Sequence, residues 1–275
     1  MKLEVWKFID DFLAGERMST DVAQKIYSEQ KTSTIMHAQR SEMFFRTVVE
    51  NAGKIGMHVN ESKTQLLCLS TCYSSNTSSF IRTTDGSEIL SGEKLKILGF
   101  YFDSDPSPSV ECHVQEMIKK VKKRAWIIRN LKHARLTYED LLKCYYSLVC
   151  PVLDYAAPVY HPMLNATQSE CLEKLQRDSL KIIFGFERSY REILQDENIE
   201  SLIDRRQVLF DNFALNLSQS NEVAQAWFPT KVFQHVDLRN ERIYVEKYAR
   251  TSRLYKSPLY TMRRRLNEIS PVTFD

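Results

Sequence analysis

EVWKFIDDFLAG, residues 4–15, contains two adjacent carboxylates, Asp10 and Asp11, between two short β-prone and apolar runs. This order of strand, acidic tip and strand predicts a β-hairpin with both acids at its turn. Adjacent carboxylates repel each other, so their pKa values rise unless a cation compensates the charge. Mg²⁺ suits such hard oxygen ligands and completes its shell with water and phosphate oxygens. The alternative is an ordinary exposed Asp-Asp turn.

The residues that follow mix one helix with short β-like runs. Residues 16–40 are polar and show no clear periodicity, whereas the pattern over 41–55 predicts a helix that ends at Gly53 and Gly56. The residues expected on its apolar face are Met43, Phe44, Thr47, Val48 and Ala52. We expect strands within 65–69 and 95–102. The prolines of 105–108 predict a linker.

Residues 104–220 show the periodicity of consecutive amphipathic helices. The first is expected to start near Ser109. Its apolar stripe is Val114, Met117, Ile118, Val121, Ala125, Ile128 and Leu131. Capping patterns place a second start at Thr137 and a third near Thr167, and Gly185 should end the third helix. A fourth stripe comprises Ile199, Leu202, Ile203, Leu209, Phe210, Phe213 and Leu217. Such stripes can bury one another in a small bundle.

Composition bounds the class of protein. Of the 275 residues, 43% are hydrophobic and 27% charged, as in a globular protein. The cysteines form no C-x-x-C pair and no signal peptide precedes them, which predicts reduced thiols in an intracellular protein. A zinc site from Cys68, Cys72, Cys112 and His113 fits no common metal module. No stretch is apolar enough to span a bilayer, so no membrane partner is expected.

The net charge of +3 does not establish nucleic-acid binding, but residues 117–138 contain no acid. The cations of this segment are Lys119, Lys120, Lys122, Lys123, Arg124, Arg129, Lys132 and Arg135. Such a row predicts contact with a phosphate backbone, and a solvated helix face is an equal alternative. Trp126 and His133 lie in the same segment, and residues 263–265 form a weaker basic cluster. Four aromatic side chains are expected to pack rather than stack on bases: Tyr145, Tyr146, Tyr155 and Tyr160.

Several motifs occur in the order found in one enzyme family. Phe8-Ile9-Asp10-Asp11 resembles the [Y/F]-x-D-D motif of reverse transcriptases. KIGMHVNESKT, residues 54–64, resembles the next motif of their palm domain, and LKILGFYFD, residues 95–103, resembles the strand pair that begins the primer-gripping region. The segments that resemble the thumb and the terminal stretch of non-LTR (LINE-type) retrotransposon enzymes are residues 145–160, LEKLQR at 172–177 and KSPLYTM at 256–262.

The resemblance to this family implies an α+β fold in three parts. Residues 1–104 would be a partial palm of β-hairpins plus a helix, residues 105–220 a mostly α-helical thumb bundle, and residues 221–275 a basic C-terminal tail. It also implies an RNA-directed DNA polymerase whose partners are an RNA template and a DNA primer. Asp10 and Asp11 would bind Mg²⁺ for two-metal nucleotidyl transfer. Lys63 would donate a proton to the pyrophosphate leaving group; a surface lysine is the alternative. Gly99 would allow close backbone approach, or mark a strand bulge.

The chain also departs from the family pattern. The fingers and another metal-binding Asp precede the [Y/F]-x-D-D motif in the family, and only nine residues precede Asp10 here. We therefore expect the chain to be inactive alone, with the N-terminal polymerase segment as a possible partner. The alternatives are a non-catalytic nucleic-acid-binding remnant that uses residues 117–138, and a helical scaffold protein.

Overall fold

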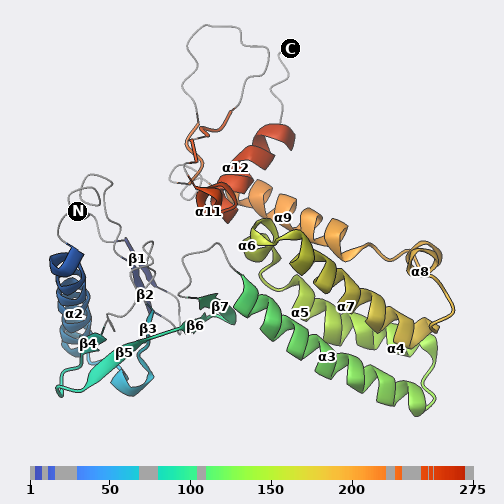
Figure 1. The fold of residues 1–275 in the computed structure, drawn as a ribbon, viewed down its shortest axis with the longest axis horizontal. Helices are drawn as coiled ribbons and strands as arrows, with labels where there is room; N and C mark the ends of the chain where they lie inside the picture. The colour runs from blue at the N-terminus through green and yellow to red at the C-terminus, as the bar shows by residue number, and fades with distance from the viewer. Residues whose placement is uncertain are drawn as a thin grey trace, which may run out of the picture. The chain divides into compact units, whose positions relative to one another are not determined.

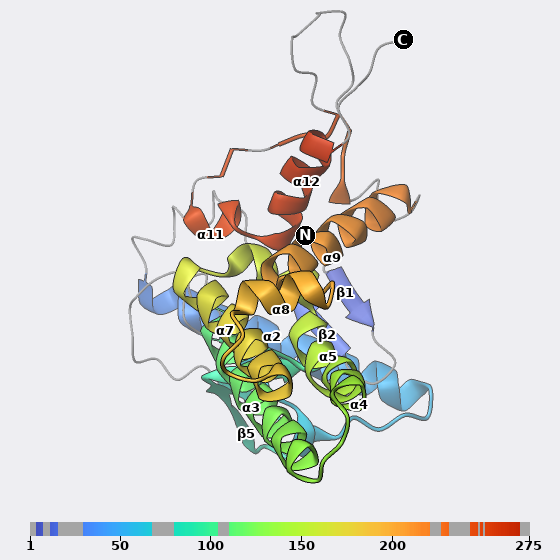
Figure 2. The ribbon, with the colours of Figure 1, turned by 90° about the vertical axis from the view of Figure 1, so that its right-hand side faces the viewer.

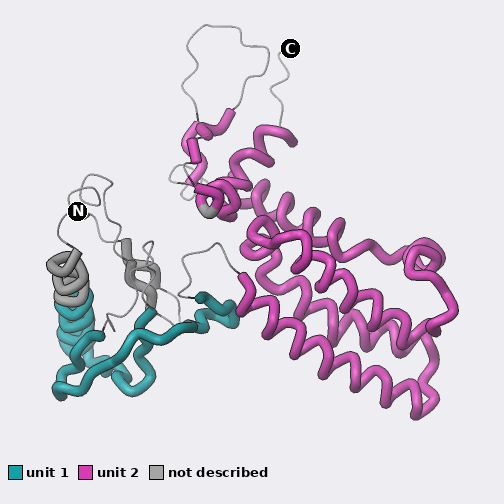
Figure 3. The backbone as a smooth tube through the Cα atoms, in the orientation of Figure 1, with its two compact units in different colours: residues 1–106 teal, residues 107–275 magenta. Residues whose placement is uncertain are grey.

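The computed structural model describes residues 4–7, 12–15, 30–67, 80–103, 110–220, 227–230, 243–246, 248–249 and 251–269. The chain divides into two compact units, residues 1–106 and residues 107–275 (Figure 3). Helices predominate and the sheets are small, so the described residues form a mixed α and β fold. This agrees with the α+β class expected from the sequence.

Unit 1 begins with the predicted pair of strands. Strand β1 (Glu4–Lys7) pairs antiparallel with β2 (Phe12–Gly15), in a register that sets Glu4 opposite Gly15 and Lys7 opposite Phe12. Both strands of the expected hairpin are therefore confirmed. Asp10 and Asp11 fall between them in the sequence and lie outside the described residues.

Helix α2 (Gln30–Lys54) is longer than expected and begins within the polar stretch 16–40. Its end at the two glycines is confirmed. Gly56 has φ +74°, its N–H bonds to the Gly53 carbonyl at 3.1 Å, and the Met57 N–H bonds to the Ala52 carbonyl at 2.9 Å. This is a Schellman motif, which favours glycine because an L side chain is strained at positive φ.

The apolar face expected for α2 is partly wrong. Among residues 41–54 of this helix, Phe45 is the buried side chain, whereas Met43 is 72% exposed and Thr47 is also exposed. The helix packs against strand β4 (Phe80–Arg82), and so short a strand covers only a small part of a helix surface. The remaining apolar positions, Val48 and Ala52 among them, are half-buried.

A three-stranded sheet follows α2, and two of its three strands, β4 and β5, were not expected. In the order β3-β5-β4, strand β5 (Glu88–Gly92) runs parallel to β3 (Leu66–Leu67) and antiparallel to β4. The turn from β4 to β5 contains Asp85-Gly86, with Gly86 at φ +88°. Asp-Gly between short strands is a hairpin signal that the sequence analysis overlooked.

The last strands of unit 1 form a hairpin, β6 (Lys94–Ile97) and β7 (Phe100–Asp103). Its two turn residues, Leu98 and Gly99, both have positive φ, at 47° and 82°. Positive φ at both positions defines a type I′ turn, which matches the twist of the strands. The register is unbroken, so the bulge alternative for Gly99 is wrong, and the glycine serves the turn.

Unit 2 is helical. Helix α3 (Glu111–His133) packs against α7 (Ala166–Phe184), and the two helices run side by side in Figure 1. The stripe predicted on α3 is largely confirmed, because Val114, Met117, Val121 and Ile128 are buried. The other predicted members, Ile118, Ala125 and Leu131, are half-buried at its edges.

The second helix comprises α4 (Tyr138–Cys144), a π-helical turn η2 (Tyr145–Val149) and α5 (Cys150–Asp154). The N-cap at Thr137 is confirmed, since its hydroxyl accepts from the Asp140 N–H at 3.2 Å. The wide turn precedes Pro151, which has no N–H to continue the helical bonding. Residues 157–163 then form two short turns, α6 (Ala157–Tyr160) and η3 (His161–Met163).

The third helix, α7, begins at Ala166, near Thr167 as expected, but its cap lies two residues before the predicted one. The cap of α7 is Asn165, whose side chain accepts from the Gln168 N–H at 2.8 Å, while the Gln168 side chain accepts from the Asn165 N–H at 3.0 Å. Asn165 has the extended backbone that an N-cap requires, whereas Thr167 lies inside the helix. The end at Gly185, with φ +101°, is confirmed.

Four more helices of the described residues complete unit 2: α8 (Tyr190–Asp196), α9 (Leu202–Gln219), α11 (Ser252–Tyr255) and α12 (Pro258–Ile269). The stripe predicted for the fourth helix is partly wrong. Its members Ile199, just before α9, Leu202 and Phe210 are buried, but Ile203 and Phe213 are each 44% exposed. The other buried residues of α9 are Arg206 and Ala214.

Residues 221–275 were expected to form a basic C-terminal tail, but those that the structure describes complete the core of unit 2. Helix α12 packs against α9, and the two lie next to each other in Figures 1 and 2. Their contact surrounds a buried cluster of Phe210, Ala214, Phe228, Met262 and Leu266. Arg265 of α12 also forms an ion pair with Asp211 of α9 at 3.0 Å.

Candidate nucleic-acid interface

The outer side of α3 carries most of the predicted cations. Lys119, Lys122, Lys123 and Arg129 are exposed and recur at three- and four-residue spacing, which places them on one side of the helix. Lys120 is exposed at the margin of this side. The opposite side is the buried stripe that packs on the bundle. We call these five cations the basic face; Lys119 to Arg129 spans about 15 Å along the helix.

Two cations of the predicted row bond instead within unit 2. A guanidinium N–H of Arg124 donates to the Leu148 carbonyl. The Lys132 ammonium donates to the carbonyls of Ile182, at 2.7 Å, and Ile183, at 3.1 Å, in the last turn of α7. A cation there satisfies orphan carbonyls and favours the negative end of the helix dipole. These two residues hold helices together, which the sequence analysis did not foresee.

Trp126 lies in the middle of the basic face and is 60% exposed. Lys122 and Lys123 precede it by one turn of helix, and Arg129 follows by one turn. Among the residues that the structure describes, Glu116 borders this face and pairs with Lys119 at 2.7 Å, just before the acid-free segment. The surface therefore combines repeated positive charge with a large aromatic ring on a helix that the core holds in place.

Beneath this surface, unit 2 contains a buried polar network. Gln176 is fully buried; its side-chain oxygen accepts from the Tyr145 hydroxyl at 2.8 Å, and its amide donates to the Glu200 carbonyl at 2.8 Å. Arg205 donates to the same Gln176 oxygen at 3.1 Å and to Asp154 at 2.9 Å. Tyr145 and Gln176 thus fasten the second helix to α7, and Asp154 fastens it to α9.

Glu173 supports the start of α9 from α7. Only 5% exposed, it accepts from the backbone N–H groups of Leu202, at 3.2 Å, and Ile203, at 3.0 Å, and from the Tyr190 hydroxyl at 2.5 Å. Arg206 is fully buried one turn later and donates to the Ser169 hydroxyl at 2.9 Å. Burial lowers the pKa of Arg206, and the nearby Glu173 charge opposes that shift.

The expectation that four aromatic side chains pack is confirmed for two of them. Tyr145 and Tyr160 are fully buried, and the Tyr160 hydroxyl donates to the Leu153 carbonyl. Tyr146 and Tyr155 are 47% and 51% exposed, so they do not belong to the core, although Tyr146 packs edge-on against Tyr145 with 5.4 Å between the ring centres.

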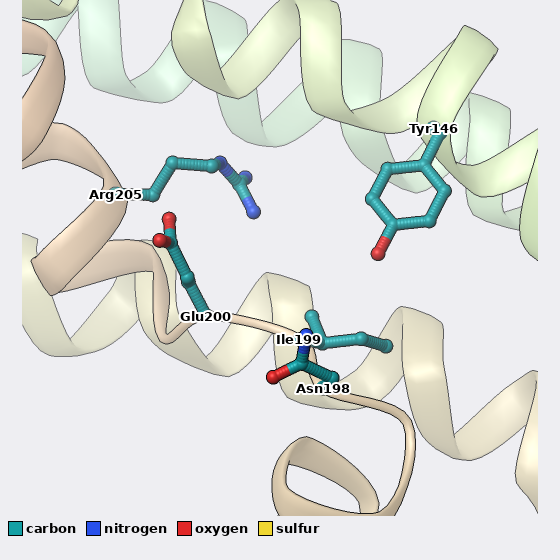
Figure 4. Close-up of a pocket in the computed structure, with 5 residues that line it drawn as sticks. All are labelled: Tyr146, Asn198, Ile199, Glu200 and Arg205. Carbon is teal, nitrogen blue, oxygen red and sulfur yellow. The ribbon is translucent and has the colours of Figure 1, made fainter.

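A pocket of about 280 Å³ lies beside the polar network. Its lining residues are Tyr146, Asn198, Ile199, Glu200 and Arg205, drawn in Figure 4. The Arg205 guanidinium points toward the side of the pocket where Tyr146 lies, and its Nη2 is buried without a hydrogen-bond partner in the structure. Because Asp154 and Gln176 already bond Arg205, its guanidinium has one nitrogen left to face a ligand, and this pocket does not define a reaction.

The structure places one of the three residues predicted to carry chemistry. Lys63 is exposed at the end of the short helix η1 (Glu61–Lys63), and Glu61 anchors this helix by accepting from the Thr84 N–H at 3.1 Å. Asp10 and Asp11 lie outside the described residues, so their distance from Lys63 is not defined. Within the described ranges, no group of three or more His, Cys, Asp or Glu side chains could hold a metal ion.

Of the four zinc ligands considered in the sequence, the structure describes two. Cys112 and His113 are buried on the inner side of α3, and burial lowers the pKa of His113 to about 4. Cys68 and Cys72 lie outside the described residues. His113 packs against Tyr160, with 5.7 Å between the ring centres, and is thus part of the core of unit 2.

Comparisons with protein-family models, curated proteins and solved structures found no match. In the described part of the chain, none of the helices is both long and apolar enough to cross a membrane. The interpretation of function therefore depends on the motifs of the sequence and on the geometry of the two units.

Proposed function

We propose that this chain is the palm-and-thumb part of a non-LTR reverse transcriptase and that it binds an RNA template carrying a DNA primer. The pairing of β1 with β2 on either side of the acidic pair carries the proposal. A turn between paired strands presents neighbouring carboxylates at one edge, where Mg²⁺ ions can bridge them to phosphate oxygens. The Schellman end of α2 and the β6–β7 hairpin occur within the next two motifs, in the expected order.

In this proposal Asp10 and Asp11 hold Mg²⁺, and Lys63 protonates the pyrophosphate leaving group. The basic face of α3 contacts the phosphate backbone of the primed template. Support for the last step comes from the exposure of Lys119, Lys122, Lys123 and Arg129 on one side of a helix whose other side is buried. Primer extension by residues 1–275 alone is expected to be absent, because the motifs include only one of the family's metal-binding aspartate strands.

Binding to a fluorescent primed template, measured by anisotropy at several salt concentrations, tests the proposal. The double variant Lys122→Glu with Lys123→Glu should weaken binding by about tenfold or more and reduce the salt slope by about 2, since each phosphate contact contributes about 1. The matched control is Lys174→Glu, an exposed lysine on α7. Equal affinity for the double variant and the control would remove the basic face from the proposal.

A second candidate, a nucleic-acid-binding remnant without catalysis, is favoured by the basic face itself, which requires no metal. The double variant Asp10→Ala with Asp11→Ala distinguishes the polymerase part from the non-catalytic remnant when nucleotide binding is measured with and without Mg²⁺. For a polymerase part, Mg²⁺ should raise the affinity of the wild-type complex for a complementary nucleoside triphosphate, and the variant should lose that response. For the remnant, neither Mg²⁺ nor the substitutions should change nucleotide binding, while template binding persists.

A further inference from the structure

The most exposed large hydrophobic side chain of α3 is Trp126, and no packing role accounts for it. Val121 and Ile128, close to it in sequence, are almost completely buried, whereas the indole is 60% exposed and its neighbour Ile127 is 40% exposed. Single exposed apolar side chains are common on protein surfaces. Here, however, the ring lies between two turns of the helix that both carry cations. An apolar partner surface would leave these charges without a counter-charge.

We infer that the basic face of α3 binds nucleic acid with unpaired bases, and that the Trp126 indole stacks on one of those bases. The inference rests on the proposed function, because it assumes that the basic face binds nucleic acid. It goes further by naming the form of nucleic acid and the residue that recognises it.

The choice between paired and unpaired nucleic acid follows from which surfaces each exposes. In a duplex the flat faces of the bases cover one another, and the grooves expose only base edges and phosphates. An indole on a helix surface gains most from a flat base, which a single strand or an overhang next to a duplex supplies. Surfaces that bind single strands combine backbone-tracking cations with aromatic rings on which bases stack.

The spacing along α3 fits this arrangement. Lys122 and Lys123 lie about 5 Å along the helix axis before Trp126, and Arg129 lies a similar distance after it. Their long side chains can therefore reach phosphates on both sides of a base stacked on the indole. The extended Lys and Arg stems add apolar contact beside the ring. Charge complementarity thus favours nucleic acid over an apolar helix as the occupant of this face.

The experiment compares three probes of equal length: a single-stranded RNA, a blunt RNA–DNA hybrid, and a primed template with an unpaired overhang. Wild type, Trp126→Ala and Trp126→Phe are titrated with each probe by anisotropy, in the full chain. Trp126→Ala should weaken binding to the single strand and to the overhang probe by about tenfold, and binding to the blunt hybrid by less than about twofold. Trp126→Phe should retain most of the affinity, because phenylalanine also stacks.

Intrinsic fluorescence gives a second readout, because binding to the cations alone would not place a base against the indole and quench it. Single-stranded RNA should quench the emission of the wild type more than that of Trp126→Phe, since a stacked base quenches the indole directly. Thermal unfolding should be unchanged in both variants, because the indole is mostly exposed. Unchanged affinity and quenching in Trp126→Ala, or an equal loss on all three probes, would overturn the inference.

The proposed function has a separate point of failure. If Lys122→Glu with Lys123→Glu weakens binding to every probe while Trp126→Ala does not, the proposed function stands and the stacking role is wrong. If the wild type binds none of the probes, both are wrong. If polyglutamate or anionic vesicles bind as tightly as single-stranded RNA and require Trp126 equally, the face recognises something other than bases, and the inference is wrong.

Discussion

Unit 2 uses charged residues in two opposite ways, on the outer side of α3 and in the interior between α7 and α9. In the interior, Glu173 and Arg205 are enclosed by hydrogen-bond partners from other helices. On α3, Lys122 and Lys123 extend from a helix without ordering the core. The LEKLQR stretch, which resembles a family motif, contributes to the interior, and so does Asp154. The candidate binding surface, by contrast, lies at residues that belong to no motif.

The sharpest test of this division is Glu173→Ala. The change leaves two backbone N–H groups at the start of α9 without an acceptor, and it removes the carboxylate nearest to the buried Arg206. Losing one partner of a buried charge network costs about 3–5 kcal/mol. We expect the free energy of unfolding in urea to fall by this amount, while the folded variant binds primed template as the wild type does.

Glu170→Ala is the matched control on the same helix. Glu170 pairs with Arg177 at 2.9 Å, but its side chain is 64% exposed, so its loss should cost less than about 1 kcal/mol. Similar losses for the two variants would show that the interior carboxylate has no special structural role.

The inner side of α3 should make the stability of the protein depend on acid pH, because it buries a histidine. Burial lowers the pKa of His113 from 6.5 to about 4, so the folded protein holds a neutral imidazole where the unfolded chain takes up a proton. The contribution of His113 is complete above pH 6.5 and is lost as the pH falls toward 4, by about 3 kcal/mol in total. Urea unfolding at several pH values within this window measures the loss.

Helix α3 contains two histidines, the buried His113 and the exposed His133, and substitutions at both test whether burial causes the pH dependence. His113→Phe should make the dependence on pH shallower, and part of it should remain because burial also lowers the pKa of His161. His133→Asn, at an exposed position of the same helix, is the control for replacing a histidine of α3 as such. A slope unaffected by His113→Phe would contradict the assignment.

The features predicted correctly from sequence depend on residues close together in the chain. The glycine end of α2, the Thr137 cap and the paired strands around the acidic dipeptide are all of this kind. Competing local signals explain the error at α7, where Asn165-Gln168 and Thr167-Glu170 have the same spacing and only the backbone at Asn165 decides between them. The inward bonds of Arg124 and Lys132 could not be predicted, because their acceptors, Leu148 and Ile182, lie 24 and 50 residues farther along the chain.

The smallest expected effect concerns Lys132. It belongs to the cation row in the sequence, but its ammonium bonds to two carbonyls of α7. Lys132→Met keeps the aliphatic stem but removes two donors from the last turn of α7, so the free energy of unfolding should fall by about 1 kcal/mol. Template binding and its salt slope should change little, because the ammonium is already engaged. Lys122→Met, at an exposed position on the same helix, should give the reverse: unchanged stability, weaker binding and a salt slope smaller by about 1. If Lys132→Met weakens binding as much as Lys122→Met, the row acts as one surface, and bonds to carbonyls do not withdraw a lysine from phosphate contact.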